Sequence, residues 1–174
     1  MPRPSRRGFL ESGVLASLSL TSPVPDVGAQ SQDGGAQRWQ FQTGNRVDSS
    51  PTVVDGTVYV GSGDRHLYAI DAADGTEQWS IETDSAGQYS PMVVGKTVYI
   101  PDEGTVRALN ANDGTEQWSF DREAIWENSS PIVVDDTLYI GGSDGTVYAL
   151  DTADGTMRWS LETDAELRNP VVAT

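Results

Sequence analysis

Short apolar runs of four to six residues alternate with turn-forming residues along the chain after Trp39. Val, Ile, Tyr and Thr dominate these runs, which are too short for helices, so the pattern predicts strands. Runs such as Val58–Val60 are apolar at successive positions, which predicts strands that are covered on both faces. No helical period of useful length occurs after residue 30. The sequence therefore predicts an all-β protein.

The residues between neighbouring runs favour tight hairpins. Asp55-Gly56 lies between two apolar runs and suits a two-residue turn with positive φ. Gly95-Lys96 and Asp135-Asp136 occupy the same place in later copies, so the turn is kept while its residues change. A proline opens the first strand of each copy, where a residue need not donate a hydrogen bond to the sheet.

Two markers recur along the chain with one spacing. The tryptophans are separated by 40, 39 and 41 residues, and the prolines by 40, 40 and 39. Four short antiparallel strands in each unit of about 40 residues predict the blade of a β-propeller, whereas the repeats of the alternative, a β-solenoid, are usually shorter. We expect blades at about 51–83, 91–120 and 131–163, a partial blade from residue 170, and the last strand of a degenerate unit at Trp39. The markers are Trp39, Trp79, Trp118, Trp159, Pro51, Pro91, Pro131 and Pro170.

One motif occurs three times within these units. Residues 69–79 and 149–159 fit A-x-D-x-x-x-G-x-x-x-W, and residues 108–118 fit it with Asn110 in place of the aspartate. By its chemistry the aspartate or asparagine is suited to cap turn amides. The motif resembles the tryptophan-docking motif of the quinoprotein, or PQQ-like, β-propellers, and the resemblance covers about residues 39–172.

The resemblance implies a role for each motif residue. The alanine would leave room for an indole from the neighbouring blade, the glycine would take the tight turn into the outer strand, and the tryptophan would pack across the blade interface. The repeated turn is thus predicted to join blade to blade. The residues concerned are Ala69, Asp71, Gly75, Trp79, Ala108, Asn110, Gly114, Trp118, Ala149, Asp151, Gly155 and Trp159.

The number of blades predicts an incomplete ring. Propellers that this chain resembles close with around six to eight blades. About three are present here, so we expect the N-terminal part of a longer propeller, with further blades from the same or another chain needed to close the ring.

Composition narrows the function. The chain has 174 residues, with 26 Asp plus Glu against 11 Lys plus Arg and a net charge of −15. Such an acidic surface repels phosphates and argues against nucleic-acid binding. The single lysine, Lys96, and the excess of acids resemble proteins of salt-loving organisms, with an ordinary acidic protein as the alternative. The absence of cysteine excludes disulfides and thiolate chemistry.

The N-terminus resembles an export signal. Arg6 and Arg7 follow a serine and precede Phe9-Leu10 and a short apolar stretch, which is the pattern of the twin-arginine signal. The apolar stretch is too short to span a bilayer, and small residues at 27–29 suit cleavage after Ala29. We therefore expect a signal peptide at 1–29, a linker at 30–38 and an exported, soluble protein without a membrane span. An amphipathic N-terminal helix is the alternative.

Catalytic chemistry is not predicted for this chain. Quinoprotein dehydrogenases that share the resemblance hold pyrroloquinoline quinone and calcium with a cluster of Glu, Asn and Asp, and often a vicinal disulfide. The conspicuous acids here belong to the repeated turns, where capping already explains them. We therefore assign no catalytic, cofactor-binding or metal-binding residue, and expect the quinone and calcium only in a longer parent protein. The acids are Asp71, Asp74, Asp113, Asp151 and Asp154.

A few residues outside the motif are candidates for contacts. His66, the only histidine, stands at the start of a strand and is expected to be an exposed cross-strand residue. Tyr89 and Trp126 lie in the connections that precede the innermost strands, together with Val47 and Leu167. They form either an apolar rim for a protein partner or plugs over the blade ends.

The function that we expect is a non-catalytic, exported propeller that binds a protein partner or acts as an assembly scaffold. The resemblance extends to the propeller component of outer-membrane protein assembly. The competing hypothesis is the N-terminal fragment of a quinoprotein dehydrogenase whose active site lies beyond this chain. The sensor domain of a membrane kinase is a weaker alternative, because no kinase motif is present.

Overall fold

The computed structural model describes residues 37–85, 87, 89–125 and 130–163, and within them the chain forms twelve strands and no helix. The predicted signal peptide and most of the predicted linker, as well as the partial blade from residue 170, lie outside these residues. The strands are β1 (Thr52–Val54), β2 (Thr57–Ser62), β3 (His66–Asp71), β4 (Glu77–Glu82), β5 (Met92–Val94), β6 (Thr97–Asp102), β7 (Thr105–Asn110), β8 (Glu116–Asp121), β9 (Ile132–Val134), β10 (Thr137–Gly141), β11 (Thr146–Asp151) and β12 (Met157–Glu162).

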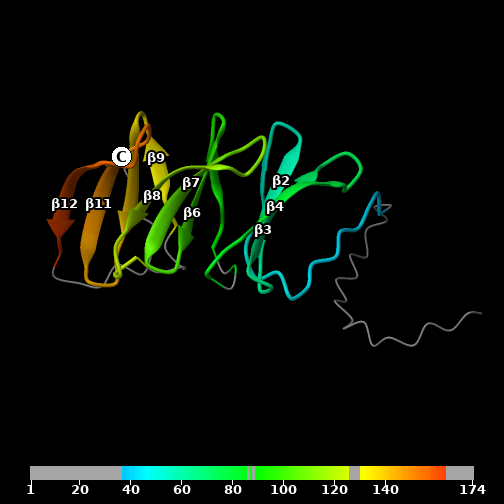
Figure 1. Cartoon of the computed structure of the whole chain (residues 1–174), viewed down its shortest axis with the longest axis horizontal. Coiled ribbons are helices and arrows are strands. Elements are labelled where there is room, and N and C mark those ends of the chain that lie inside the picture. The colour runs from blue at the N-terminus through cyan, green and yellow to red at the C-terminus, as the bar shows by residue number, and fades with distance from the viewer. Residues whose placement is uncertain (1–36, 86, 88, 126–129, 164–174) are drawn as a thin grey trace, which may run out of the picture. The chain divides into compact units, whose positions relative to one another are not determined.

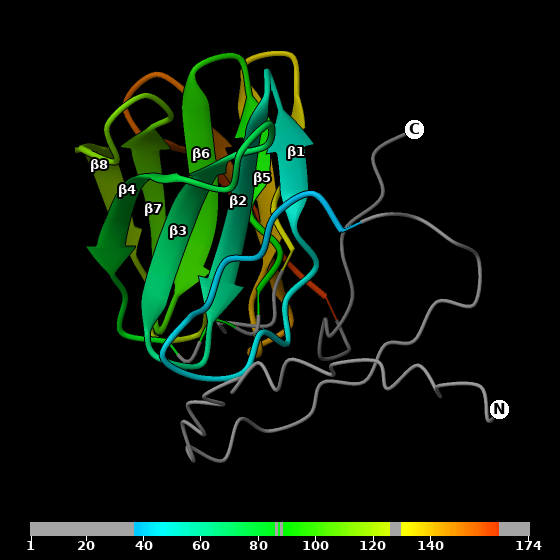
Figure 2. The same ribbon diagram turned by 90° about the vertical axis from the view of Figure 1, so that its right-hand side faces the viewer.

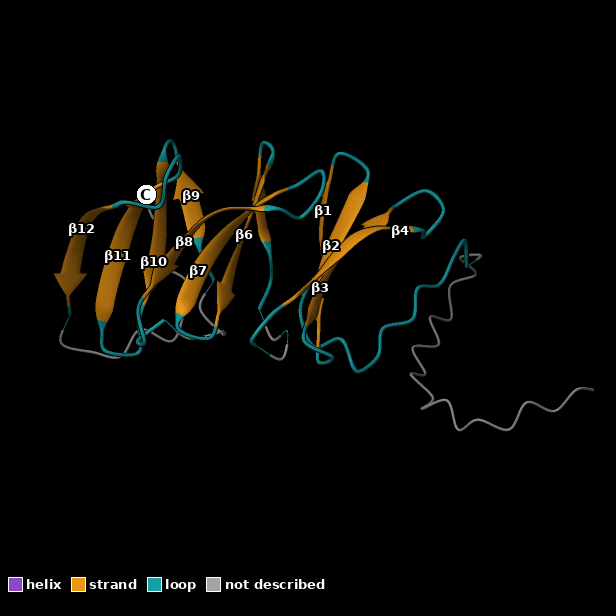
Figure 3. Ribbon diagram, viewed as in Figure 1, coloured by secondary structure: helices purple, strands orange, loops and turns teal. Residues whose placement is uncertain are grey.

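The strands form three separate four-stranded antiparallel sheets, each in simple chain order. Blade 1 is β1-β2-β3-β4, blade 2 is β5-β6-β7-β8, and blade 3 is β9-β10-β11-β12. The three sheets follow one another in a row, with blade 2 between blades 1 and 3 (Figures 1 and 3). The prediction of an all-β partial propeller built from four-stranded antiparallel blades is confirmed.

The first hairpin of each blade has the predicted tight turn. Val54 pairs with Thr57, and the two residues between them have φ of 49° (Asp55) and 79° (Gly56). Both values lie in the left-handed region that a type I′ turn requires. Gly95 and Asp135 are the first turn residues of blades 2 and 3, in the position of Asp55, with φ of 59° and 52°.

One turn explains why the tryptophan spacing varies. Between the second and third strands, blade 1 has a turn of residues 63–65 and blade 2 a shorter turn of residues 103–104. Blade 3 has residues 142–145 at this place, and Thr146 follows them as His66 follows the turn of blade 1. The missing residue in blade 2 shortens the interval from Trp79 to Trp118 to 39 residues and lengthens the interval from Trp118 to Trp159 to 41.

The outer strand of each blade begins with a β-bulge. Ala69 pairs with Trp79, whereas Ile70 pairs with Glu77, so the intervening Gln78 has no partner in β3. Blades 2 and 3 have the same irregularity. A bulge bends its strand and re-aims the following side chains. In each blade the residue directly after the extra one is the tryptophan of the motif.

The hydrophobic core lies between the sheets. One cluster joins Tyr59, Leu67 and Trp79 of blade 1 to Val98, Ile100 and Leu109 of blade 2. A second cluster joins Tyr99, Val106 and Trp118 of blade 2 to Leu138, Ile140 and Leu150 of blade 3. Blade 2 is therefore covered on both faces, as its continuous apolar runs predict.

Trp39 is carried by an irregular segment and not by a strand. The prediction of a degenerate outer strand at this place is wrong, because the structure assigns no strand between residues 37 and 51. The described part of the chain contains no helix with the length and apolar character needed to cross a membrane.

Candidate functional site: the tryptophan-docking turns

The repeated acidic turn has the same backbone in all three blades. In blade 1 the N–H of Asp71 donates to the carbonyl of Thr76 at 2.8 Å, and the N–H of Gly75 donates to the carbonyl of Asp71 at 2.9 Å. The corresponding bonds of blades 2 and 3, from Asn110 with Gly114 and from Asp151 with Gly155, are all 2.8 or 2.9 Å long. Three copies of one sequence thus build one loop geometry.

The first acidic residue of each turn caps a backbone amide, as its chemistry suggests. Oδ1 of Asp71 accepts from the N–H of Ala73 at 2.8 Å. Oδ1 of Asn110 accepts from Asn112 at 3.0 Å, and asparagine therefore replaces aspartate without loss of the bond. In blade 3 the carboxylate of Asp151 accepts from Ala153 at 2.9 Å and also pairs with Arg158 at 2.7 Å.

A second carboxylate in each turn is held by a threonine. In blade 1 the backbone N–H and the hydroxyl of Thr76 donate to Oδ1 of Asp74 at 2.9 and 2.8 Å. In blade 2, Thr115 does the same for Asp113 at 3.0 and 2.7 Å. These bonds favour the ionised carboxylate and lower the pKa of both aspartates. The acids of the turns are therefore bonded within their own turns.

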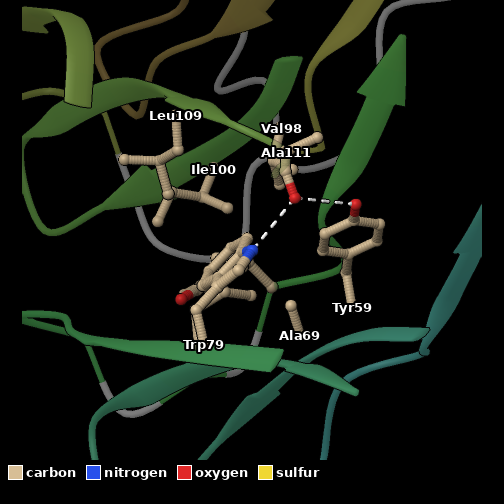
Figure 4. Close-up of a cluster of buried hydrophobic side chains, with 9 residues drawn as sticks. Tyr59, Ala69, Trp79, Val98, Ile100, Leu109 and Ala111 are labelled. Atoms are coloured by element: carbon tan, nitrogen blue, oxygen red, sulfur yellow. Dashed lines mark hydrogen bonds between the residues drawn. The ribbon is translucent and has the colours of Figure 1, made fainter. Parts of the chain in front are cut away.

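Each turn receives the indole of the preceding unit. The N–H of Trp79 in blade 1 donates to the carbonyl of Ala111 in blade 2 at 2.9 Å, and Tyr59 donates to the same carbonyl at 3.2 Å (Figure 4). Trp118 donates to the carbonyl of Thr152 in blade 3 at 2.9 Å. Trp39 donates to the carbonyl of Ala72 in blade 1, also at 2.9 Å. The buried indole N–H thus finds the acceptor that it requires.

The motif glycine is required by the indole as well as by the turn. Gly75, Gly114 and Gly155 have φ between 72° and 78°, where a side chain is disfavoured. A Cβ atom at these places would lie 2.7, 2.8 and 2.5 Å from ring atoms of Trp39, Trp79 and Trp118 respectively. The glycine therefore provides the flat surface on which the indole lies.

The motif alanine lies beside the tryptophan of its own blade. Ala69 pairs across the sheet with both Tyr59 and Trp79, and its small side chain leaves room for these two rings, whose centroids are 5.9 Å apart (Figure 4). The expectation that it makes room for the neighbouring blade's indole is therefore wrong. Ala108 and Ala149 lie in the same way between Tyr99 and Trp118 and between Tyr139 and Trp159.

The described residues offer no receiving turn to the indole of the third motif. Trp159 is 45% exposed, whereas Trp79 and Trp118 are each 8% exposed. Leu161 on the same face is 57% exposed. No acceptor among the described residues bonds the Trp159 N–H, and none of the three blades covers this face of blade 3.

An ionic cluster centred on the buried Asp102 lies beside the connection between blades 1 and 2, and the repeat pattern did not predict it. Asp102, which is 1% exposed, accepts from the N–H of Ser85 at 2.9 Å and pairs with Arg107 at 3.0 Å. Arg107 also pairs with Glu116 at 2.8 Å. Burial alone would lower the pKa of Arg107, but its bonds to Glu116 and Asp102 outweigh it and raise the pKa. Arginine replaces the tyrosine of the other two blades, which was the signal in the sequence.

The candidate rim residues that the structure describes differ in their burial. Tyr89 is 1% exposed, so it does not belong to a surface rim; from the connection between blades 1 and 2 it joins the core cluster that these blades share. Trp126 and Leu167 lie outside the described residues. Val47 is 47% exposed. His66, with its side chain 40% exposed, lies beside Tyr68 in β3 and contacts Asp64.

The described residues do not provide the donor set that a quinoprotein calcium site needs. They contain no group of three or more His, Asp or Glu side chains placed to hold a metal ion. The turn carboxylates are bonded within their own turns, and the buried Asp102 is neutralised by Arg107. The chemistry that this arrangement supports is the docking of aromatic side chains.

Comparisons with known proteins agree with this geometry. BamB from Moraxella catarrhalis is 26% identical, with a TM-score of 0.65 over 71% of this chain and 40% of that one. Quinohemoprotein alcohol dehydrogenase ADHIIG from Pseudomonas putida is also 26% identical, with a TM-score of 0.60 over 72% of this chain and 22% of that one. This chain thus spans less than half the length of either protein.

A designed protein, Ika4, shares the fold at 15% identity, with a TM-score of 0.66 over 78% of this chain and 86% of that one. No curated protein sequence matches significantly. The family model described as "Outer membrane protein assembly factor BamB" matches residues 25–171, and the chain therefore belongs to that family of PQQ-like β-propeller repeat proteins.

Proposed function

We propose that this protein is an exported, non-catalytic β-propeller component that binds another protein and serves as an assembly scaffold. The observation that carries the proposal is the use of the repeated acids. Their oxygens accept hydrogen bonds from their own turns, as Asp71, Asp74 and Asp113 do, and the motif that they shape holds aromatic side chains. Membership of the family named for an outer-membrane protein assembly factor supports the same function.

A dehydrogenase fragment is the second candidate. It is supported by the 26% identity to a quinohemoprotein alcohol dehydrogenase over 72% of this chain. In that case the quinone and calcium would be held by residues beyond those described here, since the described acids do not form a suitable set. Blades 1 to 3 would then have a structural role in a larger enzyme.

Ligand binding tests whether this chain itself holds the quinone and calcium. The chain is heated with pyrroloquinoline quinone and CaCl₂, and again with quinone and a calcium chelator, while unfolding is followed. A ligand at 100 times its dissociation constant adds about 2.7 kcal/mol of stability, which raises the Tm of a chain of this size by roughly 5–10 °C. We expect no calcium-dependent rise and no dye-linked alcohol oxidation. A rise of that size would contradict the non-catalytic assignment.

Protein binding is tested by chemical cross-linking in the compartment to which the chain is exported. We expect the chain to be recovered covalently joined to a different polypeptide. Recovery of the chain alone, or joined only to itself, would contradict a scaffold for another protein.

Export by the twin-arginine route is tested with residues 1–29 fused to a reporter that folds before transport. We expect the double substitution Arg6→Lys, Arg7→Lys to retain the reporter inside the cell. Arg3→Lys is the matched control, because it changes an arginine outside the pair. Equal export of all three fusions would contradict the route.

A further inference from the structure

Two buried hydroxyl groups in the connection between blades 1 and 2 lack a hydrogen-bond partner among the described residues. They are the Oγ of Ser85 and the OH of Tyr89, and both residues are 1% exposed. A buried polar group without a partner costs free energy, and such groups in native proteins are usually bonded to other protein groups or to ordered water. The two hydroxyls therefore require a partner that the described residues do not supply.

The connection holds both residues in place without using their hydroxyls. It leads from β4, at one edge of blade 1, to β5, at the opposite edge of blade 2 (Figure 2). The N–H of Ser85 donates to Oδ1 of Asp102 at 2.9 Å. The ring of Tyr89 belongs to the core cluster of blades 1 and 2 and lies against Gly61, where an added Cβ would be 3.4 Å from its Cε2. The positions of the two hydroxyls are thus fixed by other contacts.

The surroundings of the Tyr89 hydroxyl are polar. Burial has the largest influence on this group and raises its pKa. Smaller influences come from the hydroxyls of Thr83 and Ser85, which lower the pKa, and from two charged groups, Asp102 and Arg107. These groups therefore lie near the Tyr89 OH. The raised pKa keeps the phenol neutral, so it has a proton to donate.

Asp102 offers an acceptor at the same place. A carboxylate has two oxygens with about four lone-pair sites. Oδ1 accepts from the Ser85 N–H, and Oδ2 accepts from Arg107 at 3.0 Å, which leaves a lone pair on each oxygen. Asp102 is 1% exposed, so bulk solvent does not reach it. Two unpartnered donors thus lie beside a buried acceptor that is not saturated.

The connection between blades 2 and 3 is built differently. Ile125 of that connection is 1% exposed and belongs to the apolar cluster of blades 2 and 3. Gly142 donates to the carbonyl of Thr146 in the place where Asp102 pairs with Thr105, so blade 3 has no carboxylate there. An apolar side chain therefore lines the second connection, whereas polar groups enclose a site in the first.

We propose that the hydroxyls of Ser85 and Tyr89 and the carboxylate of Asp102 form a binding site for one internal water molecule. The water accepts from both hydroxyls and donates to the carboxylate, which gives it about three partners, as buried waters typically have. The hydroxyl of Thr83, which donates to the carbonyl of Ser85 at 3.1 Å, can accept the second proton of the water. The water thereby ties the connection to blade 2 and stabilises the junction of the two blades.

A water molecule suits the charges of this site better than a cation does. Asp102 is already paired with Arg107 at 3.0 Å, and the pKa of Arg107 is raised, so the pair is ionised and neutral overall. A metal or ammonium ion would lie close to the guanidinium, and two like charges repel strongly where water is excluded. Water supplies the missing acceptor and donors without adding a charge.

Tyr89→Phe tests the site by the sign of its effect, because it keeps the ring and removes only the hydroxyl. If this hydroxyl is bonded to the water, its loss should lower the Tm of the full chain by roughly 2–4 °C. If the hydroxyl had no partner, its removal would relieve the cost of burying it and raise the Tm. Differential scanning calorimetry measures the shift, and a raised or unchanged Tm would overturn the proposal.

Tyr59→Phe is the matched control. Tyr59 is 4% exposed, and its hydroxyl donates directly to the carbonyl of Ala111 at 3.2 Å, so this variant shows what the loss of one buried tyrosine hydrogen bond does to the Tm. We expect Tyr89→Phe and Tyr59→Phe to lower the Tm by similar amounts. A loss in Tyr59→Phe together with a gain in Tyr89→Phe would show that the Tyr89 hydroxyl has no partner.

Crystallography of the unaltered chain at atomic resolution identifies the occupant and does not depend on the folding of a variant. We expect one ordered water within hydrogen-bond distance of both hydroxyls and of Asp102, in crystals grown from sodium salts and from rubidium salts. A rubidium peak at the site in anomalous difference maps would show a cation site and overturn the proposal. Direct bonds from the two hydroxyls to protein groups, with no density between them, would overturn it as well.

Discussion

Trp118 and Trp159 occupy the same place in two copies of one motif, yet one is buried and the other is exposed. Trp118 is 8% exposed, and its N–H donates to blade 3 at 2.9 Å, whereas Trp159 is 45% exposed. Within its own blade each ring has an equivalent tyrosine neighbour, Tyr99 or Tyr139, and the ring centroids are 5.8 Å apart in both pairs. The blade alone therefore places the indole, and the next blade supplies its burial and its hydrogen bond. Most of the motif's stabilising effect should come from the interface.

The largest expected difference is between the two tryptophans themselves. Trp118→Ala should lower the free energy of unfolding by about 3–5 kcal/mol, because it opens a cavity between two blades. Trp159→Ala should cost less than about 1 kcal/mol, as a substitution at an exposed site. Urea denaturation of both variants measures the difference. Equal losses would mean that the interface does not provide the stabilisation.

The buried ion pair sharpens the comparison at the other interface. Asp102→Ala removes the acceptor of the buried Ser85 N–H and one of the two carboxylates that pair with Arg107, and it should cost about 3 kcal/mol. Asp48→Ala is the control, since Asp48 pairs with Arg46 at 2.6 Å on the exposed surface and should cost less than about 1 kcal/mol. Similar losses would show that burial of the pair is not what matters.

Two glycines with nearly the same φ separate turn strain from docking. Gly56 (φ 79°) has no atom within 4 Å of an added Cβ, whereas Gly114 (φ 72°) has the Trp79 ring at 2.8 Å. Gly56→Ala should cost about 1 kcal/mol from backbone strain alone. Gly114→Ala should cost about 2–3 kcal/mol, because the indole must also move. Equal thermal shifts would assign the whole effect to the backbone.

The smallest expected effect concerns the pKa of a turn aspartate and the loss of stability at low pH. The pKa of Asp113 is lowered, first by the Thr115 hydroxyl and then by the Thr115 N–H. A lowered folded-state pKa means that the stabilisation is complete above about pH 4 and is lost as the pH falls through the folded-state value. Thr115→Val should raise the pKa of Asp113 and leave that of Asp74 unchanged, as NMR titration of the carboxyl carbons would measure. An unchanged pKa of Asp113 would contradict the assigned bond.

The repeat made the blades predictable, because the spacing of prolines, tryptophans and turn residues reflects local hydrogen bonding that each unit forms alone. The positive φ of Asp55 and Gly56 follows from the same local chemistry. Contacts between units were harder to predict. The side on which Ala69 meets an indole depends on the bulge at Gln78, which shifts the register by one residue without a strong sequence signal.

The positions at which one blade departs from the repeat indicate contacts that the repeat itself does not predict. Arg107 stands where blades 1 and 3 have Tyr68 and Tyr148, whose hydroxyls donate to Asp64 and Asp144 in their own hairpins. In blade 2 the shorter turn removes that aspartate, and Asp102 takes over as the acidic partner. The burial of Tyr89 likewise depends on how the connection between blades folds back, which no local pattern specifies.

The central claim is that the repeated turn joins blades by docking an indole on its glycine. A double-mutant cycle of Trp79→Ala and Gly114→Ala tests it most directly. Because the added Cβ collides with the ring of Trp79, Gly114→Ala should cost only its backbone strain, about 1 kcal/mol, once the ring is gone. The two losses should therefore sum to at least about 1 kcal/mol more than the double variant loses. Strict additivity would contradict the claim.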